Sequence, residues 1–556
     1  MTAASTTRQY DAIVVGAGAG GGIAAALLCE AGHHVLLLER GQSLTFKQVG
    51  RDHIRNQRIS LYGHNAGPDI EGNPRVYVPD PSNPGRALTV KPHEGGYNNN
   101  AATVGGGTRV YGAQAWRFME QDFRMASIYG VPEGSSLSDW PIRYSDLEPY
   151  YEQAEIELGV CGDAEANQYK APRRRNYPMP PVPRTLSGKV LAAGAAKLGW
   201  NTFTTPMLIN SVPYSGRNAC VQCQHCVGFA CPSDAKNGTH NTMIPRALAT
   251  GLCELTTDAM CEKIEIDAQG RVVGVSYLVE RDGTISRYSP RARAVIVSAG
   301  AIESARLLLN SSSQSHPNGL GNEHDQVGRN LQGHVYPGSH ALFEDNMWDG
   351  IGPGVSISTC QFNHGNAGVV GGGMLSDEFI KLPIIFWYRS IPPDVPRWGL
   401  AAKEWMRNAY TRTLQVMGPI QDTPNPDCRV TIDSSVKDRY GLPVARLSGY
   451  THSESIKTAE FMWERSREWL LACGAIKVWG DRPGPGMSGG QHQAGTCRMG
   501  ADPRSSVTDS YGRVHSHDNL FVMDASVHVT NGGFNPVLTI MALAFRNAAK
   551  LAADLR

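Results

Sequence analysis

The chain has 556 residues, 41% of them hydrophobic and 61 of them glycine, and 52 Lys plus Arg nearly balance 51 Asp plus Glu. That length exceeds what one hydrophobic core organises, so two domains are expected. A net charge of +1 predicts no attraction to nucleic acid or to an acidic membrane. No run approaches the roughly 20 apolar residues of a membrane helix. The polar segment Met1–Tyr10 lacks the pattern of a secretory signal, so the expected location is cytoplasmic.

The first predicted unit runs from Asp11 to Gly41. The apolar run Ala12–Val15 predicts a β-strand, Ile23–Glu30 predicts a helix, and Val35–Leu38 predicts a second strand. A glycine-rich turn joins the first strand to the helix. A strand, a glycine turn, a helix and a strand in this order are typical of a dinucleotide-binding unit.

The residues of the turn suit that function. Gly16 permits the tight turn, Gly18 lets the backbone approach a pyrophosphate, and Gly21 lets the helix pack against the strand. The helix N-terminus then offers free N–H groups to the phosphates. Glu39 follows the second strand, where an acidic side chain can bind the ribose hydroxyls. The unit predicts an ADP-containing dinucleotide, FAD or NAD.

The rest of the chain alternates two patterns. Parallel-sheet patterns recur as a strand, turn and helix at Arg293–Asn310, a strand ending at Asp524, and a helix at Val537–Leu555. Between them, residues 335–480 show short alternating runs, with a hairpin at Cys428–Asp433 and Leu442–Leu447 and a long helix at Ser453–Cys473. Further predictions are a polar excursion at 42–98, helices at 139–159, 186–198 and 242–249, paired strands at 253–278 and a loop at 327–334.

These patterns predict an α/β fold with an inserted α+β domain. The dinucleotide domain is assembled from residues 1–140, 186–334 and 481–556. The substrate domain comprises residues 141–185 and 335–480.

Four stretches together resemble the glucose–methanol–choline (GMC) flavoprotein oxidoreductases. They are the opening VVGAGAGG…LLLERG, the loop Gly105–Thr108, VIVSAGAIESARLLL, and the C-terminal HQAGTCRMG…NLFVMDASV…NPVLTIMALAFR. The resemblance covers nearly the whole chain. It implies FAD rather than NAD, held in part by Gly106 and Thr108, and an antiparallel substrate-binding sheet over the flavin.

Within the family, the chain is most similar to sugar-oxidising members, among them FAD sugar dehydrogenases, pyranose oxidases and glycoside 3-oxidising enzymes. Ala115–Phe118, Asp139–Ile142 and Tyr177–Pro183 favour the dehydrogenases. The resemblance implies oxidation of a secondary hydroxyl of a pyranose or glycoside to a ketone. Electrons then pass to oxygen or to a quinone- or cytochrome-type acceptor, with an acceptor protein as one option. The alternatives are a non-sugar alcohol (sterol, aliphatic or aryl) as substrate, or a non-redox flavoprotein lyase.

Two residues match the family's catalytic positions. His492 stands at the position of the catalytic histidine and Asn535 at that of its partner. The unperturbed pKa of histidine lies nearest neutral pH, so an imidazole can take the hydroxyl proton while hydride leaves the carbon. Asn535 can hold the same oxygen without competing for the proton, and it is also expected at the flavin. Asp524 is expected near the ribityl chain or pyrophosphate. For His528 and His334, an ordinary hydrogen-bonded loop histidine is the favoured interpretation.

Some family members tether FAD through a histidine just after the Gly-Gly-Thr turn. Here Arg109, Val110 and Tyr111 follow Thr108. Non-covalent FAD is therefore expected.

The cysteines cluster at one place, Cys220-x-x-Cys223-x-x-Cys226-x(4)-Cys231-Pro232. The run is close to the ferredoxin pattern that ligates iron–sulfur clusters, but one residue longer before the last cysteine. Related sugar dehydrogenases have such a cluster in this region, whereas other family members have cysteine-rich loops without one. Reduced thiols or a structural bridge are favoured, and the cluster is the alternative. No metal ion is predicted, because zinc sites usually have two separated pairs of ligands.

Overall fold

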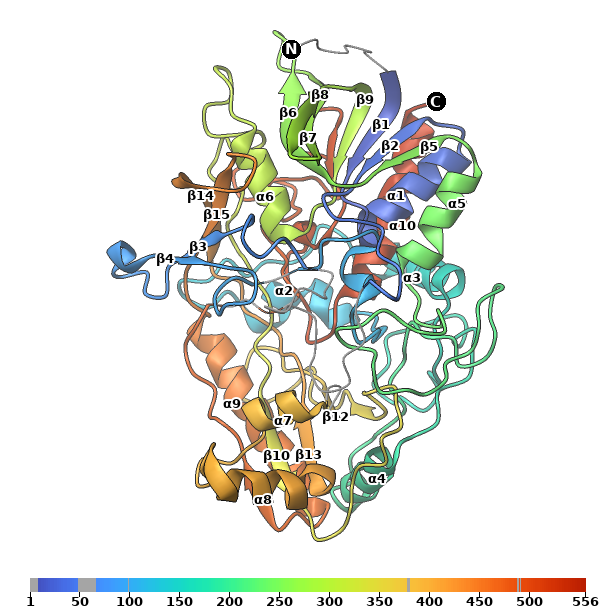
Figure 1. Cartoon of the computed structure of the whole chain (residues 1–556), viewed down its shortest axis with the longest axis vertical. Coiled ribbons are helices and arrows are strands. Elements are labelled where there is room, and N and C mark those ends of the chain that lie inside the picture. The colour runs from blue at the N-terminus through green and yellow to red at the C-terminus, as the bar shows by residue number, and fades with distance from the viewer. Residues whose placement is uncertain (1–8, 49–66, 99, 378–380, 488–489, 491) are drawn as a thin grey trace.

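The computed structural model describes residues 9–48, 67–98, 100–377, 381–487, 490 and 492–556. Expectations for the N-terminal segment 1–8, and for 49–66 within the polar excursion, lie outside the described residues. Figure 1 shows the large sheet and the C-terminal end of the chain at one end of the molecule, and α4, α7, α8 and α9 at the other.

The large sheet holds the dinucleotide unit. At its centre β1 (Gln9–Val15) lies between β2 (Val35–Leu38) and β9 (Arg291–Val297), all parallel. Two further strands are parallel neighbours, β5 (Cys253–Thr256) beside β2 and β17 (Leu520–Val522) beside β9. The antiparallel strands β6 (Ala259–Ile266), β7 (Val272–Arg281) and β8 (Thr284–Tyr288) complete it. The predicted α/β fold is confirmed.

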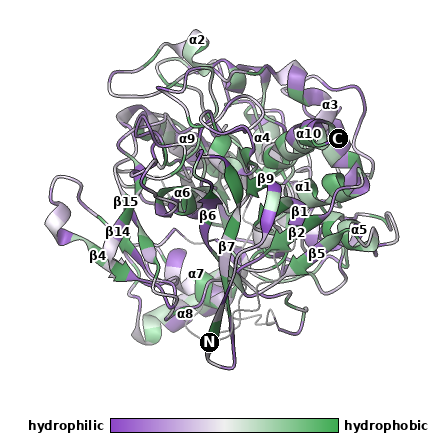
Figure 2. Cartoon of the chain, turned by 90° about the horizontal axis from the view of Figure 1, so that it is seen from above, coloured by the Kyte–Doolittle hydropathy of each residue, from purple (hydrophilic) through white to green (hydrophobic). Residues whose placement is uncertain are grey.

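Strands covered on both faces read as continuous apolar runs, which explains why this sheet could be predicted. Ile13, Val14, Leu37 and Val295 are fully buried. Figure 2 shows the hydrophobic colour gathered on these inner strands and on the neighbouring helices. On one side of the sheet, α1 (Ala19–Glu30) packs against α5 (Met243–Ala249) and α10 (Val537–Asp554), and α10 packs against α3 (Tyr144–Leu158).

A second sheet is antiparallel, as the predicted α+β insertion requires. Its strands are β10 (Gly338–Leu342), β11 (Ser358–Thr359), β12 (Leu375–Asp377), β13 (Thr413–Met417) and β16 (Lys477–Trp479). The predicted long helix, α9 (Ser453–Ala472), packs on β10 and β13 and against α4 (Leu186–Lys197). The buried Trp469 ring donates its N–H to the Leu191 carbonyl, which joins the two helices.

The predicted hairpin, β14 (Arg429–Lys437) and β15 (Pro443–Ser448), lies in a third sheet. In this sheet β15 pairs with β3 (Arg75–Tyr77), and β3 pairs with β4 (Leu88–Val90). The hairpin packs on α6 (Ala301–Asn310), the helix that follows β9. The hairpin, which belongs to the segment predicted as the substrate domain, thus adjoins the dinucleotide unit. The boundaries of the two domains stay a prediction.

The remaining helices are short: α2 (Met125–Tyr129), α7 (Pro383–Arg389) and α8 (Gly399–Ala409). Within the described part of the chain, every helix is too short or too polar to cross a membrane.

A buried ion network fixes α3 against the segment that precedes it. Arg117 donates two hydrogen bonds to the Glu155 carboxylate, at 2.8 and 2.7 Å, and Arg173 donates a third at 2.7 Å. Burial alone would lower the pKa of Arg117, but the Glu155 carboxylate raises it. The neighbouring Trp116 ring stacks on Phe534, next to Asn535. The network therefore supports the entry to α10, where the predicted catalytic amide lies.

We predict that Glu155→Gln destabilises the protein by about 3–5 kcal/mol, because it removes the carboxylate that the buried Arg117 and Arg173 share and leaves Arg117 only a longer contact of 3.4 Å with Glu148. The matched control is Glu165→Gln, since Glu165 is 73% exposed and pairs with Lys170 at the surface. Loss of an exposed pair costs at most about 1 kcal/mol. Urea unfolding of the FAD-bound proteins measures both, and equal midpoints for the two variants would contradict the assignment.

Candidate active site

A cavity of about 500 Å³ runs from the dinucleotide unit to the predicted catalytic pair. Residues of the dinucleotide unit and of the pair line its wall. Most residues predicted from the sequence are found in its wall: Gly16, Gly18, Glu39, Gly106, Thr108, His492, Asp524 and Asn535. Gly21 is not in the wall but lies against the Gly16 carbonyl. One space therefore joins a dinucleotide-binding loop to a histidine and an amide.

The glycines of the turn differ in what requires them. Packing against the backbone requires Gly16 and Gly21, whereas Gly18 faces the cavity. A Cβ at Gly16 or Gly21 would come within 2.3 Å of a backbone oxygen, and Gly16 has a left-handed φ of +104°. A Cβ at Gly18 would meet nothing within 4 Å, and its φ of −85° suits any residue. The protein itself therefore does not require Gly18. The cradle at this position fits a pyrophosphate that approaches the backbone.

Glu39 lies in the cavity wall with part of its acceptor capacity used. One carboxylate oxygen accepts from the Ala17 N–H at 3.0 Å and the other from the Gly41 N–H at 2.9 Å. Burial raises the pKa of this carboxyl, and the two backbone donors oppose that shift. A carboxylate has about four acceptor positions, so both oxygens can still accept hydrogen bonds from ribose hydroxyls.

The second glycine turn packs directly on the first. Gly105 and Gly106 have left-handed φ values of +92° and +53°. A Cβ at Gly106 would lie 3.0 Å from the Cα of Gly18. The Thr108 hydroxyl donates to the Gly105 carbonyl at 2.6 Å and closes the turn. Thr108 thus shapes the wall of the cavity through this turn.

Asp524 follows β17 and joins two turns. Its Oδ2 accepts from the Gly300 N–H at 2.9 Å and the Ser304 hydroxyl at 2.6 Å, and its Oδ1 accepts from the Ser526 N–H at 2.8 Å. These bonds tie the start of α6 to the end of β17. A contact between Asp524 and the cofactor stays a prediction.

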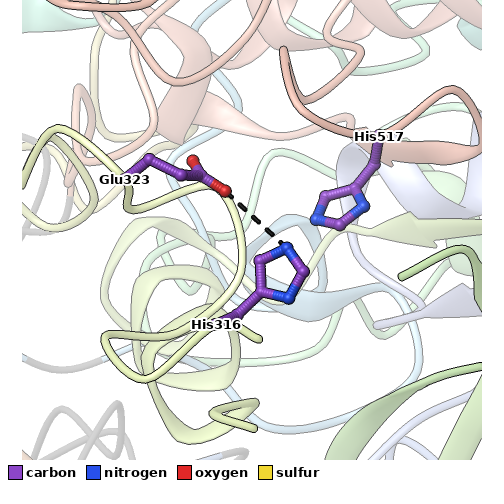
Figure 3. A group of neighbouring side chains, drawn as sticks. All are labelled: His316, Glu323 and His517. Atoms are coloured by element: carbon purple, nitrogen blue, oxygen red, sulfur yellow. Dashed lines mark ion pairs between the residues drawn. The ribbon is translucent and has the colours of Figure 1, made fainter. Parts of the chain in front are cut away.

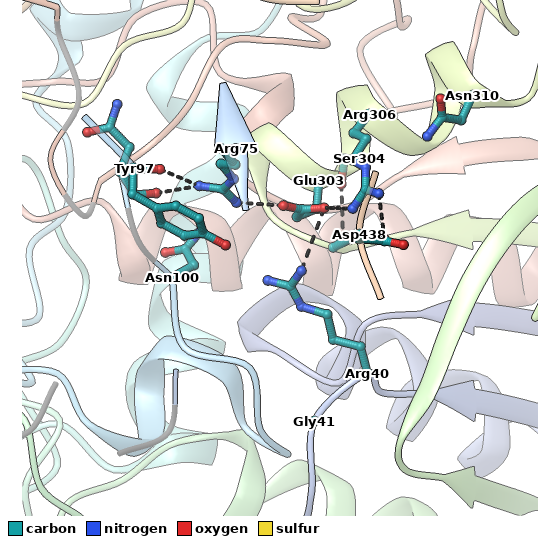
Figure 4. Close-up of polar contacts among 12 residues, drawn as sticks. Arg40, Gly41, Arg75, Tyr97, Asn100, Glu303, Ser304, Arg306, Asn310 and Asp438 are labelled. Carbon is teal, nitrogen blue, oxygen red and sulfur yellow. Dashed lines mark hydrogen bonds and ion pairs between the residues drawn. The ribbon is translucent and has the colours of Figure 1, made fainter. Parts of the chain in front are cut away.

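An ion network that the sequence did not reveal borders the Glu39 end of the cavity. Figure 4 shows Glu303 of α6 facing the guanidinium groups of Arg40, Arg75 and Arg306. Burial alone would raise the pKa of Glu303, but the three arginines lower it. Arg75 also donates to the Tyr97 carbonyl at 2.6 Å. The network therefore joins β3 and the chain at Tyr97 to α6, beside the dinucleotide cavity.

His492 is the centre of a hydrogen-bond network at the other end of the cavity. Its Nδ1 lies 2.9 Å from His334 Nδ1 and 2.9 Å from the Tyr336 hydroxyl. Its Nε2 lies 3.4 Å from the Asn535 amide nitrogen. The Asn531 amide donates to the His492 carbonyl at 2.7 Å. The fold therefore brings together the two residues predicted as the catalytic pair.

The neighbours of His334 indicate the tautomers of His334 and His492. His334 Nε2 lies 3.0 Å from the Asn531 carbonyl and 2.7 Å from the Gly532 carbonyl. Carbonyl oxygens only accept, so this nitrogen carries a proton. Burial lowers the pKa of His334, which favours its neutral form. In the neutral ring with a proton on Nε2, Nδ1 is an acceptor. His492 Nδ1 is then the donor of the pair, and a neutral His492 presents an unprotonated Nε2 beside Asn535.

Sequence reasoning missed two members of this network, His334 and Tyr336. His334 was interpreted as an ordinary hydrogen-bonded loop histidine. Its Nε2 faces the Asn531 and Gly532 carbonyls, and its Nδ1 also lies 2.9 Å from His492 Nδ1. Its φ of +65° is rare for a residue with a side chain. Backbone strain of this kind gathers at functional sites. The loop position alone gave no signal of this contact.

The chain matches the GMC oxidoreductase family over residues 10–336 and 424–544. It belongs to this family. Membership confirms the predicted resemblance and the enzyme class, and it indicates FAD as the dinucleotide of the cavity.

Three relatives align with nearly the whole chain. A 6'''-hydroxyparomomycin C oxidase of Streptomyces lividus is 30% identical over 99% of this chain and 92% of its own. A 2-methyl-1,2-propanediol dehydrogenase of Mycolicibacterium austroafricanum is 31% identical over 97% and 94%. The fructose dehydrogenase large subunit of Gluconobacter japonicus is 28% identical over 99% of both chains. A solved formate oxidase of Aspergillus oryzae, 14% identical, shares the fold with a TM-score of 0.68 over both full chains.

His528 of this GMC oxidoreductase is fully buried. Its ring packs against Phe118 and Trp140, and its Nδ1 lies 3.2 Å from Asn531 Oδ1. Burial lowers its pKa to about 4. The interpretation as a structural histidine is consistent with this packing, because a group outside the cavity wall does not reach a substrate.

The cysteine cluster lies around a small pocket lined by Cys220, Cys223, Cys226 and Cys231. In the part of the chain that the structure describes, all four of these cysteines are free thiols. Among the described residues, no three of these sulfurs lie within 4.8 Å of one another. An iron–sulfur cluster or reduced thiols both stay open.

We predict that Gly18→Ala folds but loses FAD. The added methyl meets no protein atom and projects at the turn expected to approach the pyrophosphate. The purified variant should be colourless or release FAD on dilution, with a wild-type circular dichroism spectrum. Gly95→Ala is the matched control, because a Cβ there also meets nothing but lies outside the cavity wall. Full flavin occupancy in Gly18→Ala would disprove the assignment of this loop.

Proposed function

We propose that the protein oxidises a secondary hydroxyl of a pyranose sugar or glycoside to a keto-sugar. The observation that carries the proposal is the cavity shared by the FAD-binding turn, His492 and Asn535. FAD supplies a hydride acceptor for alcohol oxidation. The protein's own residues must then bind the alcohol, orient it and remove the hydroxyl proton.

His492 and Asn535 divide this work. The unprotonated Nε2 of His492 takes the hydroxyl proton. The Asn535 amide, 3.4 Å from that nitrogen, donates to the oxygen as negative charge develops there. Asn535 Oδ1 is buried and has no hydrogen-bond partner among the described residues, so it can accept from a second hydroxyl or from the cofactor. A vicinal diol, which every pyranose offers, can provide both groups.

The relatives support a polyol or sugar substrate without selecting one. Fructose dehydrogenase and the paromomycin-type oxidase favour a sugar-like substrate. The propanediol dehydrogenase favours the second candidate, a non-sugar alcohol. Anaerobic bleaching of the flavin by a panel of sugars, glycosides and simple diols distinguishes them. Reduction by diols but by no pyranose would exclude the sugar proposal.

The electron acceptor is oxygen or a quinone- or cytochrome-type acceptor. The fructose dehydrogenase relative is named as a large subunit, which favours an acceptor protein for this chain as well. Reoxidation of the reduced enzyme by oxygen and by a quinone dye, followed at the flavin band, compares the two routes.

We predict that His492→Ala keeps its flavin but slows flavin reduction at least about 10²-fold, the usual contribution of a positioned general base. Asn535→Ala should slow it less, because the base remains. Wild-type reduction should fall as pH decreases, since protonated His492 cannot accept the proton. Burial lowers the pKa of His334, and it lowers that of His528 to about 4, so any limb from these residues lies at lower pH than for an ordinary histidine. Stopped-flow measurement of flavin reduction as a function of pH gives the rates of the wild type and both variants.

The exposed histidine His324 provides the control: His324→Ala should reduce its flavin at the wild-type rate. Reduction of His492→Ala within about threefold of wild type, far below the effect of a positioned base, would show that another group is the base.

We also propose that FAD is bound without a covalent bond, because Arg109 follows Thr108 where tethering members have a histidine nearby. Acid precipitation should release the yellow colour into the supernatant. Colour retained in the washed pellet would reveal a covalent link.

A further inference from the structure

A second group of ligand-bearing side chains lies outside the cavity wall. His316 and Glu323 belong to the loop that follows α6, and His517 precedes β17. Figure 3 shows the two imidazole rings and the carboxylate turned toward one another. His316 and Glu323 lie close together in the sequence, but His517 is far from both. The fold brings His517 to the other two.

The spacing of the three groups suits one metal ion. A ligand atom from each lies within 4.8 Å of the other two, and His316 Nε2 lies 3.9 Å from Glu323 Oε1. Nitrogen and oxygen ligands at about 2.1 Å from a tetrahedral ion lie roughly 3.4 Å apart. Rotation of the exposed Glu323 side chain is enough to reach that separation.

Each histidine has one nitrogen directed to the group. His316 Nδ1 lies 3.0 Å from the Ser315 hydroxyl, which leaves Nε2 as the ligand atom. His517 is 5% exposed, and its buried Nε2 has no hydrogen-bond partner among the described residues. Its ring also hydrogen-bonds the backbone of Gly270. A hydrogen bond at one nitrogen and a ligand position at the other is the usual arrangement of metal-binding histidines.

The loop that carries His316 is held in place before any ion binds. The His316 carbonyl accepts from the Ser313 N–H at 3.0 Å and the Gly319 N–H at 3.1 Å. The Leu320 N–H donates to the Leu308 carbonyl of α6 at 3.0 Å. The ligands therefore stand on fixed backbone, which lowers the entropy cost of binding.

We propose that His316, Glu323 and His517 form a binding site for a divalent transition-metal ion of the zinc class. Two imidazoles and one carboxylate suit zinc, copper or nickel rather than calcium or magnesium, which prefer oxygen ligands. With three protein ligands, the fourth position takes water. The ion joins the loop after α6 to the segment that leads into β17 and Asp524, so it stabilises the sheet edge that supports the cavity. This proposal does not depend on the proposed substrate.

The test is Zn²⁺ titration of the chelator-treated, FAD-bound protein by calorimetry. Wild type should show a site that His316→Gln and Glu323→Gln weaken at least tenfold. His324→Gln is the matched control, since His324 is exposed and adjacent to Glu323 but outside the group. The cysteine cluster is intact in all four proteins, so zinc bound there gives a signal common to them. Identical isotherms for all four would overturn the proposal.

Two further readouts keep the test independent of folding defects. One equivalent of Cu²⁺ should give an electron paramagnetic resonance spectrum with imidazole nitrogen splitting that His316→Gln alters and His324→Gln does not. Zn²⁺ should raise the unfolding temperature of wild type and the control but not of Glu323→Gln. An equal rise in Glu323→Gln would also overturn the proposal.

Discussion

Close backbone contact between strand ends determines the geometry on which this enzyme depends. A Cβ at Gly16 would lie 2.3 Å from the Ser298 carbonyl oxygen after β9, and one at Gly20 would lie 1.8 Å from the Met523 carbonyl oxygen after β17. Only glycine permits this approach without displacing the backbone. Because the carboxyl ends of β1, β9 and β17 meet here, the start of α1 faces one cavity. Asp524 reinforces the contact by joining the end of β17 to the start of α6.

Hydrogen bonds between distant segments organise the end of the cavity that contains His492 and Asn535. His334 comes from the loop before β10, His492 from the segment after β16, and Asn535 from the start of α10. The two carbonyl groups that face His334 Nε2 fix its tautomer, and His334 in turn orients His492. In the reaction that we propose, a His492 held in this way needs no rearrangement before it accepts a proton, which is how preorganised sites lower a barrier. His334 then acts through His492 as a positioning residue.

Family membership and geometry answer different questions about this protein. The match over residues 10–336 and 424–544 establishes a GMC oxidoreductase. Relatives of similar identity are named for a sugar, an aminoglycoside-type molecule and a simple diol. A shared cofactor-binding unit therefore coexists with varied substrates, as expected when function resides in sites placed on a common fold. Among the described residues of this chain, the Asn535 Oδ1 has no hydrogen-bond partner, and our proposal assigns it to a polyol substrate or the cofactor.

The sequence by itself determined the elements whose physics is local. The apolar runs Ala12–Val15 and Val35–Leu38 predict buried parallel strands, and the turn from Gly16 to Gly21 needs glycine for close approach. The 428–447 hairpin and the long helix from Ser453 were also predictable, because their periodicity lies within one short window. His492 and Asn535 could be named only through the surrounding family motifs.

Only the tertiary structure decided which distant residues meet. It placed the β14–β15 hairpin beside β3, three arginines around Glu303, and His334 with Tyr336 against His492. It also brought His517 to His316 and Glu323. A single histidine in a polar loop looks the same in sequence whether it faces water or another imidazole. The difference depends on long-range packing, which local residue patterns do not record.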